Sequence, residues 1–195
     1  MFHMEQDSYN SSLAGKDYGL EIIGFLLKFK TGHIRSIART LEVNHMTILR
    51  KTKDLIEENV LDFKLEGKNK VFFLKKSVEA RNHAFTYEHY KLVRILKQYS
   101  YLRNIVDKIH RDSRIKIALI FGSYAKFTAD KTSDIDLFIE TNKQEIRKEL
   151  LLLSSKLSIK IGEYDKNNDL AKEIEKNHVI IKGVEEYYDK AGIFN

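Results

Sequence analysis

The stretch that decides the fold is IKIALIFGSYAKFTADKTSDIDLFIE, from Ile115 to Glu140. Its first residues, up to Phe121, are nearly all apolar and β-branched or aromatic, which is typical of a buried strand. Gly122 and Ser123 interrupt this apolar run, and a short helix is expected from about Tyr124. A second apolar run, Ile135–Ile139, predicts a second strand. The stretch therefore predicts two strands joined through a glycine–serine turn, a short helix and a loop.

Two carboxylates stand at the start of the second strand. Side chains two residues apart on a strand point to the same face, so Asp134 and Asp136 project together while Ile135 faces a core. Adjacent acids repel each other, and a fold keeps such a pair chiefly to hold a cation. Gly122 and Ser123 offer a residue without Cβ, a hydroxyl and free N–H groups at a helix start, which suits a phosphate. The alternative interpretation is an ordinary turn with two surface acids on an edge strand.

Gly122-Ser123, ten intervening residues and Asp134-Ile135-Asp136 resemble the signature of the DNA polymerase β-like nucleotidyltransferase superfamily. The small prokaryotic or archaeal members, the minimal nucleotidyltransferases, are the closest match, and the wording Ser133-Asp-Ile-Asp-Leu137 also fits. The resemblance implies that Asp134 and Asp136 are catalytic and bind Mg²⁺. It also implies that Gly122 and Ser123 hold the terminal phosphates of a nucleoside triphosphate, with ATP as the first candidate.

The sequence departs from this family in two places. Active members usually carry a third carboxylate on a later strand, but the outward positions of LSIKI are Ser158 and Lys160. Glu163 and Asp165 lie just past the end of that strand and are the nearest acids in sequence. Loss of the third acid would weaken the chemistry and leave nucleotide and metal binding intact. The second departure is Phe127, where the family commonly has glycine, and a bulky side chain there would narrow the turn or the pocket rim.

Length and composition describe a globular protein of one large or two small domains. The chain has 195 residues, 43% of them hydrophobic and 32% charged, and no cysteine. It lacks the ~20-residue apolar run of a membrane helix, and its N-terminus lacks the pattern of a signal peptide. A cytoplasmic protein without a membrane partner is therefore expected.

Positive charge is concentrated in the N-terminal half. Residues 1–110 hold 19 Lys+Arg against 13 Asp+Glu, whereas residues 111–195 hold 15 of each. A basic excess that is confined to one half favours a polyanion partner for that half.

Apolar spacing and turn residues predict three helices and a β-hairpin in this basic half. In order, they are a helix from Leu20 that Thr31-Gly32 ends, a helix with Ile34, Ile37, Ala38 and Leu41 on one face, a helix from about His45 to Asn59 with Asn44 as N-cap, and a hairpin of Val60–Leu65 and Lys70–Leu74 around a Gly67 turn.

The order of these elements and the stretch IARTLEVNHMTILRKTKDLIEENVL resemble a winged helix-turn-helix domain. The resemblance implies that the third helix enters the major groove of duplex DNA, while the hairpin tip contacts the neighbouring backbone. The DNA-binding residues that it implies are Asn44, His45, Thr47, Arg50, Lys51 and Lys53 on the helix and Lys68 and Lys70 at the tip. The alternative is a protein-docking module with a solvated basic face.

A long helix is expected from Ser77 to about Asp112, with a break near Ser100, between the two halves. Its predicted apolar face is formed by Tyr90, Val93 and Leu96, and its tyrosines make it a candidate homodimer contact. After the Gly122–Asp136 signature, residues 141–157 are predicted to form one helix.

The expected core face of that helix is Ile146, Leu150, Leu153 and Leu157. The four consecutive leucines from Leu150 to Leu153 exceed what one face needs, so the helix is expected to be covered on two sides. A strand at 158–161, a helix at 169–177, a strand at 179–182 and a helix from Gly183 complete the prediction.

The predicted fold class is α+β, with an N-terminal winged helix-turn-helix and a C-terminal nucleotidyltransferase α/β domain with a small mixed sheet, joined by a long helix. The expected boundaries are a flexible leader at 1–16, the winged helix-turn-helix at 17–76, the helical linker at 77–112 and the nucleotidyltransferase domain at 113–195.

Two functions from different classes fit this organisation. The favoured one is a Mg²⁺-dependent nucleotidyltransferase that transfers a nucleotide from a nucleoside triphosphate to an acceptor hydroxyl on a protein, such as a partner toxin, or on a nucleic acid. The alternative is a catalytically weak or inactive DNA-binding regulator or antitoxin that senses a nucleotide.

Overall fold

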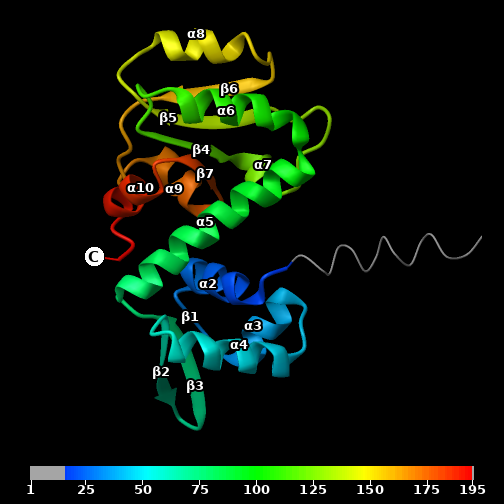
Figure 1. Cartoon of the computed structure of the whole chain (residues 1–195), viewed down its shortest axis with the longest axis vertical. Coiled ribbons are helices and arrows are strands. Elements are labelled where there is room, and N and C mark those ends of the chain that lie inside the picture. The colour runs from blue at the N-terminus through cyan, green and yellow to red at the C-terminus, as the bar shows by residue number, and fades with distance from the viewer. Residues whose placement is uncertain (1–15, 195) are drawn as a thin grey trace, which may run out of the picture. The chain divides into compact units, whose positions relative to one another are not determined.

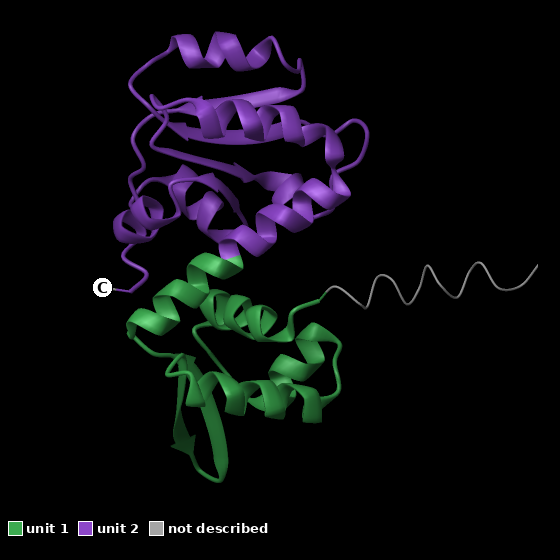
Figure 2. Ribbon diagram, viewed as in Figure 1, with its two compact units in different colours: residues 1–87 green, residues 88–195 purple. Residues whose placement is uncertain are grey.

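The computed structural model describes residues 16–194, and it divides into two compact units (Figures 1 and 2). The first unit ends at Tyr87 and the second begins at Glu88. The leader predicted at 1–16 lies, apart from Lys16, outside the described residues. The division falls within the segment predicted as a linker, and the proposed domain boundaries themselves stay predictions.

Within the described residues, unit 1 starts with the helix α2 (Tyr18–Phe29), which is capped by Asp17, whose carboxylate accepts a hydrogen bond from the Leu20 N–H at 3.1 Å. The helix ends at Lys30, which has a positive φ of 66°. The prediction that Thr31-Gly32 ends this helix by a glycine cap is therefore wrong. These residues instead form a short strand, β1 (Thr31–Gly32). A Cβ on Gly32 would lie 2.5 Å from the Phe25 ring, so close packing requires glycine there.

Two further helices and the hairpin follow in this unit as predicted. They are α3 (Ile34–Leu41), α4 (His45–Glu57), β2 (Leu61–Glu66) and β3 (Asn69–Leu74). The side chain of Asn44 accepts a hydrogen bond from the Met46 N–H at 2.8 Å, which confirms the N-cap of α4. The three strands pair antiparallel in the order β1-β3-β2, and Gly67 adopts a φ of 61° in the turn. The buried core of unit 1 includes Ile22, Ile23, Leu26, Ile37, Ile48, Leu55, Val60, Val71 and Phe72.

The predicted long helix is broken where expected. It consists of α5 (Val78–Gln98), a 3-10 turn η1 (Ser100–Leu102) and α6 (Arg103–Arg111). The predicted apolar face of α5 is wrong at Val93, which is 66% exposed, whereas Leu96 packs against the core cluster as predicted and Leu92 and Ile95 are buried. The buried residues Leu92, Ile95 and Tyr99 are spaced three and four apart, which is the spacing of one helix face.

A four-stranded mixed sheet forms the centre of unit 2. The strands are β4 (Ile117–Phe121), β5 (Ile135–Glu140), β6 (Leu157–Ile161) and β7 (Val179–Lys182), in the spatial order β6-β5-β4-β7. β4 pairs antiparallel with β5 and β7, and β5 pairs parallel with β6. The central strand β4 is buried along its whole length, as its apolar sequence predicts.

The two faces of this sheet have different covers. One face joins the buried residues of α6, α8 (Glu145–Leu151) and the C-terminal half of α5 in a single apolar cluster, which includes Leu137 and Ile139. On the opposite face, the Phe138 ring packs edge-on against the Tyr164 ring, with 6.1 Å between the ring centroids. The Tyr164 ring packs in the same way against Tyr187 of α10 (Val184–Ala191), with 5.1 Å between the centroids. Asp136 shares this second face, since it lies two residues from Phe138 on the same strand.

α8 is shorter than predicted. Ile146 and Leu150 are buried as expected, but the helix ends at Leu151 and Leu157 belongs to β6. Within the described chain, Leu152 is 88% and Leu153 46% exposed, so the expected cover on two sides is absent.

The start of α8 also differs from the prediction. The Thr141 hydroxyl donates to the Arg114 carbonyl at 3.0 Å and accepts from the Lys143 N–H at 3.2 Å. These bonds keep the residues after β5 in a loop, so the helix begins only at Glu145.

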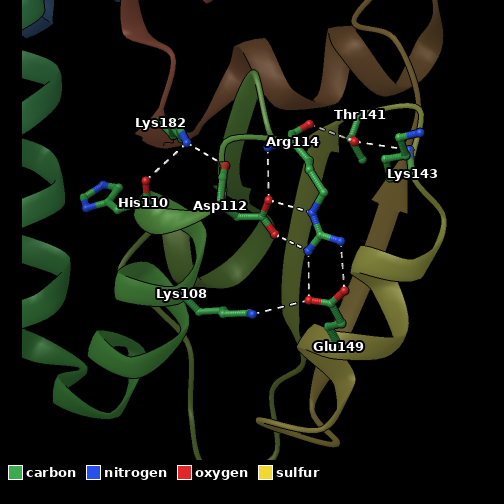
Figure 3. A network of polar contacts seen from close by, with 8 residues as sticks. All are labelled: Lys108, His110, Asp112, Arg114, Thr141, Lys143, Glu149 and Lys182. Atoms are coloured by element: carbon green, nitrogen blue, oxygen red, sulfur yellow. Dashed lines mark hydrogen bonds and ion pairs between the residues drawn. The ribbon is translucent and has the colours of Figure 1, made fainter.

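A network of charged groups fastens the segment that leads into β4 (Figure 3). The Arg114 guanidinium donates to both carboxylate oxygens of Asp112, at 2.8 and 2.6 Å, and to both of Glu149 on α8, at 3.0 and 2.9 Å. Lys108 of α6 adds an ion pair to Glu149 at 3.3 Å. The hydrogen bonds from Arg114 lower the pKa of the Asp112 carboxyl. The network ties α6, β4 and α8 together by planar, two-pronged contacts.

A second polar group is buried between α5 and α10. Glu88, which is only 2% exposed, accepts from the Tyr188 hydroxyl at 3.0 Å and lies 2.7 Å from the Lys91 ammonium. The Nδ1 of His178 faces the Ile174 carbonyl at 3.0 Å, so this nitrogen carries the hydrogen. Its Nε2 is buried 3.9 Å from Glu88 Oε2. Burial lowers the pKa of His178 to about 4.

Candidate functional site

The turn after β4 is built around Gly122. This residue opens the short helix α7 (Gly122–Ala125) with a φ of 69°, a left-handed conformation that favours glycine. A Cβ at this position would lie 2.3 Å from Asp136 Oδ2. The backbone of the turn and the carboxylate are therefore in direct contact, and only glycine satisfies both the conformation and the space.

Ser123 follows in the same turn and is half-buried. Its carbonyl accepts hydrogen bonds from the Thr128 N–H at 3.1 Å and the Thr128 hydroxyl at 3.4 Å, which hold the turn against the following loop. Its own hydroxyl makes no hydrogen bond to any of the residues that the structure describes. The hydroxyl is therefore available to a ligand.

Of the two aspartates, Asp136 lies on β5 and Asp134 lies immediately before it. Asp136 pairs with Phe121 on β4 and with Ser158 on β6, while Ile135 is buried in the core on the other face. Asp134 is exposed immediately before the strand. The structure thus brings Gly122 and Asp136 together and leaves Asp134 next to them at the same end of β5. Their roles as metal ligands and catalytic groups stay predictions.

Burial dominates the electrostatics of the half-buried Asp136. It raises the pKa of this carboxyl, and the negative charges of Asp134 and Glu173 raise it further. A hydrogen bond from the Ser158 hydroxyl and the positive charge of Lys160 act in the opposite direction. The carboxylate therefore lies in a region with an excess of negative charge, a setting that favours a bound cation.

The loop between α7 and β5 is held in place from within. Asp130 accepts hydrogen bonds from the Thr132 N–H and hydroxyl at 2.8 and 2.7 Å, and from the Ser133 hydroxyl at 3.0 Å. These bonds lower the pKa of Asp130. They fix the residues that lead directly into Asp134.

Phe127 lies in the same loop with a φ of 59°, a left-handed conformation that favours glycine. Its ring packs against the core cluster and lies under the Arg94 guanidinium, 5.2 Å from the ring centroid. This packing holds a phenylalanine in a backbone conformation that disfavours it.

The neighbouring acids that sequence offered as a third carboxylate are engaged elsewhere. Glu163 pairs with Lys190 at 3.2 Å, and Asp165 accepts from the Asn167 N–H at 2.9 Å. Within residues 16–194, no group of three or more His, Cys, Asp or Glu side chains is placed to hold a metal ion. Glu173 of α9 (Asp169–Lys176), which acts on Asp136 through its charge, was missed because only the folding of α9 brings it there.

The donor set nevertheless fits a magnesium ion. Mg²⁺ prefers oxygen ligands and is usually held by one or two carboxylates, with substrate phosphates and water completing its shell. Asp134 and Asp136 would supply the carboxylates of such a site.

The residues predicted to bind DNA lie on α4 and the hairpin of unit 1. His45, Arg50 and Lys53 are exposed and Thr47 is half-buried. The side chain of Asn44 is used to cap α4.

The remaining predicted lysines differ in their contacts. Lys51 pairs with Asp54 at 3.5 Å. Lys68 is exposed in the hairpin turn, and the Lys70 ammonium lies 3.8 Å from the centroid of the Phe63 ring. Their contact with DNA stays a prediction.

Residues 103–186 match the family model described as Polymerase beta, Nucleotidyltransferase. This range runs from the start of α6 into α10 and contains the whole sheet and the Gly122–Asp136 contact. This part of the chain is therefore similar to nucleotidyltransferase domains of the polymerase β type. A search of curated proteins finds no match to the chain. In the part of the chain that the structure describes, no helix has the length and apolar character needed to cross a membrane.

Proposed function

We propose that unit 2 transfers a nucleotide from a nucleoside triphosphate, with ATP as the first candidate, to an acceptor hydroxyl in a Mg²⁺-dependent reaction. The observation that carries this proposal is the approach of the Gly122 turn to Asp136, where a Cβ would meet the carboxylate at 2.3 Å. A turn that suits phosphates and a carboxylate that suits a metal thereby form one site. The match of residues 103–186 to a nucleotidyltransferase family model supports the same reaction class.

Each residue has a role in this proposal. Asp134 and Asp136 would hold Mg²⁺, and the Ser123 hydroxyl and the Gly122 backbone would contact the terminal phosphates. When bound, Mg²⁺ would neutralise charge on the triphosphate and on the developing leaving group. The residues of the chain would position the triphosphate and the acceptor. Positioning together with charge neutralisation accounts for most of the rate enhancement in such transfers.

The acceptor oxygen would form a bond to the α-phosphorus as the bond from this phosphorus to the bridging oxygen breaks. Pyrophosphate then leaves, and the acceptor hydroxyl loses its proton to solvent. Ser158, not an acid, stands beside Asp136 on β6, so slow turnover is expected. The same observation favours the second candidate, a domain that binds a nucleotide as a signal without transferring it.

Calorimetric titration of MgATP into the wild type and the Asp134→Asn/Asp136→Asn variant tests the site. Micromolar binding that requires Mg²⁺ and falls at least about 100-fold in the variant supports the proposal. Equal binding by both proteins would contradict the assignment. Transfer of label from α-³²P-ATP to protein or nucleic acid acceptors then separates a transferase from a nucleotide sensor.

We also propose that unit 1 is a winged helix-turn-helix domain that binds duplex DNA. Its order of helix, short strand, two helices and hairpin supports this, as do the exposed His45, Arg50 and Lys53 on α4. These side chains would face the major groove, and Lys68 at the hairpin tip would approach the backbone.

Fluorescence anisotropy with labelled duplexes at several salt concentrations tests this binding. Affinity should fall linearly with salt on a log–log scale, and Arg50→Ala/Lys53→Ala should reduce that slope by about 2. Lys116→Ala/Arg147→Ala, which removes the same charge from exposed sites in unit 2, is the matched control. Affinity that does not depend on salt would indicate a protein-docking module instead.

A further inference from the structure

One lysine on the sheet of unit 2 lies on the face of the candidate site. The parallel register of β5 and β6 pairs Asp136 with Ser158 and Phe138 with Lys160. Paired residues on neighbouring strands present their side chains to the same face, so Lys160 shares the face of Asp136. It stands two residues beyond Ser158, roughly 7 Å along the strand.

Lys160 differs from other lysines around this sheet in having no partner within the described chain. Lys182 on β7 donates to the carbonyls of His110 and Asp112 at 3.2 and 2.7 Å, and Lys190 donates to Glu140 at 2.9 Å. Lys156 donates to the Lys131 carbonyl. The side chain of Lys160 is exposed and makes no hydrogen bond or ion pair with any residue from 16 to 194.

The charges around Asp136 indicate what such an unpaired cation would bind. Asp134 and Glu173 add negative charge to the surroundings of Asp136, and Lys160 is the side chain that acts on it with positive charge. A triphosphate brings about four further negative charges, of which one Mg²⁺ cancels two. A cation within reach of the same phosphates would therefore improve binding.

We propose that Lys160 contacts the phosphate tail of the nucleotide and makes the site selective for triphosphates over monophosphates. This inference rests on the proposed function of the site. It assigns to β6 a cationic, phosphate-binding role beside the two carboxylates. Because the contact is to the phosphates, Lys160 does not discriminate between bases.

Titration of MgATP, MgADP and AMP into the wild type, Lys160→Met and Lys160→Arg tests the proposal. Lys160→Met should bind MgATP about tenfold more weakly than the wild type. Its affinity for MgADP should fall less and its affinity for AMP should be unchanged, because each phosphate removed shortens the tail that the lysine reaches. Lys160→Arg should keep most of the affinity. Lys166→Met, a charge-matched change at another exposed lysine just after β6, should have no effect.

Binding of Mn²⁺ alone, followed by electron paramagnetic resonance, separates a phosphate contact from a structural role. Removing a positive charge beside Asp136 should leave Mn²⁺ binding by Lys160→Met unchanged or tighter. Weaker Mn²⁺ binding would mean that the substitution disturbs the site, and would overturn the inference.

The outcomes distinguish this inference from the proposed function. If the Asp134→Asn/Asp136→Asn variant loses MgATP binding and Lys160→Met keeps it, the site stands and the role of Lys160 falls. If the wild type binds no nucleotide, both fall. A uniform loss by Lys160→Met across MgATP, MgADP and AMP would also contradict a contact to the phosphate tail.

Discussion

The two ends of β4 carry opposite kinds of charged structure. Before the strand, Arg114 joins Asp112 and Glu149 by two-pronged hydrogen bonds, so that each carboxylate has a cation (Figure 3). After the strand, Gly122 meets Asp136 where carboxylates outnumber cations. The same buried strand thus connects carboxylates that are each paired with a cation to a carboxylate whose charged neighbours, Asp134, Glu173 and Lys160, are mainly acidic. This difference distinguishes a structural charge cluster from a candidate binding site.

The pKa shifts of the carboxyl groups at the two ends of β4 differ in sign. The hydrogen bonds from Arg114 lower the pKa of Asp112, so this carboxylate stabilises the fold above its unfolded pKa of about 3.9. That contribution is lost as the pH falls through the lowered pKa. Burial raises the pKa of Asp136, so its charged form destabilises the fold at neutral pH.

The largest effect is expected from Gly122→Ala. The new Cβ would displace the Asp136 carboxylate, and the left-handed backbone would cost about 1–2 kcal/mol for an L-residue. Calorimetry should find Mg²⁺-dependent ATP binding weakened at least about 100-fold. Gly162→Ala is the control, because a Cβ there has no neighbour within 4 Å. Wild-type binding by Gly122→Ala would refute the close contact.

A smaller effect on folding, with none on binding, is expected from Arg114→Ala. Asp112 and Glu149 would lose their shared guanidinium, and the thermal midpoint should fall by roughly 2–4 °C. Arg111→Ala, which removes an exposed arginine paired only one turn away with Asp107 at 3.0 Å, should change it little. MgATP affinity should be that of the wild type in both variants. Loss of nucleotide binding in Arg114→Ala would show that the two ends of β4 are coupled.

The smallest effect is a gain of stability in Asp136→Asn. Removing a partly desolvated charge should raise the free energy of unfolding at pH 7 by less than about 1 kcal/mol. The gain should disappear as the pH falls below the unfolded pKa of about 3.9, because the raised pKa of Asp136 means that the folded carboxyl is then protonated as well. Urea titrations at pH 7 and below the unfolded pKa measure this difference, with the exposed Asp134→Asn as the comparison. A destabilised Asp136→Asn at pH 7 would mean that the carboxylate contributes to the fold.

The sequence predicted those elements that local chemistry determines. The apolar run into Gly122 and the alternation around Asp136 predicted β4 and β5. Asn44 predicted the start of α4, because its side chain caps the helix without help from distant residues. The family match at residues 103–186 agrees with the class of domain that the spacing between Ser123 and Asp134 indicated.

The failures occurred where tertiary contacts override local pattern. The leucines after Leu150 continue a helical pattern, yet Leu157 is used by β6 because β5 offers it a parallel partner. Thr31-Gly32 was predicted to end a helix, but these residues form a strand because they pair with β3. Glu173 gave no signal in sequence, because its effect on Asp136 depends on where α9 packs.

The buried imidazole of His178 couples folding to proton release. In the unfolded chain this side chain has a pKa of about 6.5, whereas the folded chain holds it at about 4, with Nε2 facing Glu88 across 3.9 Å. The stability that its neutral form contributes is present above pH 6.5 and is lost as the pH falls towards 4. Between these values each molecule that folds gives up to one proton to the solution. The heat of unfolding measured there will consequently depend on the ionisation enthalpy of the buffer.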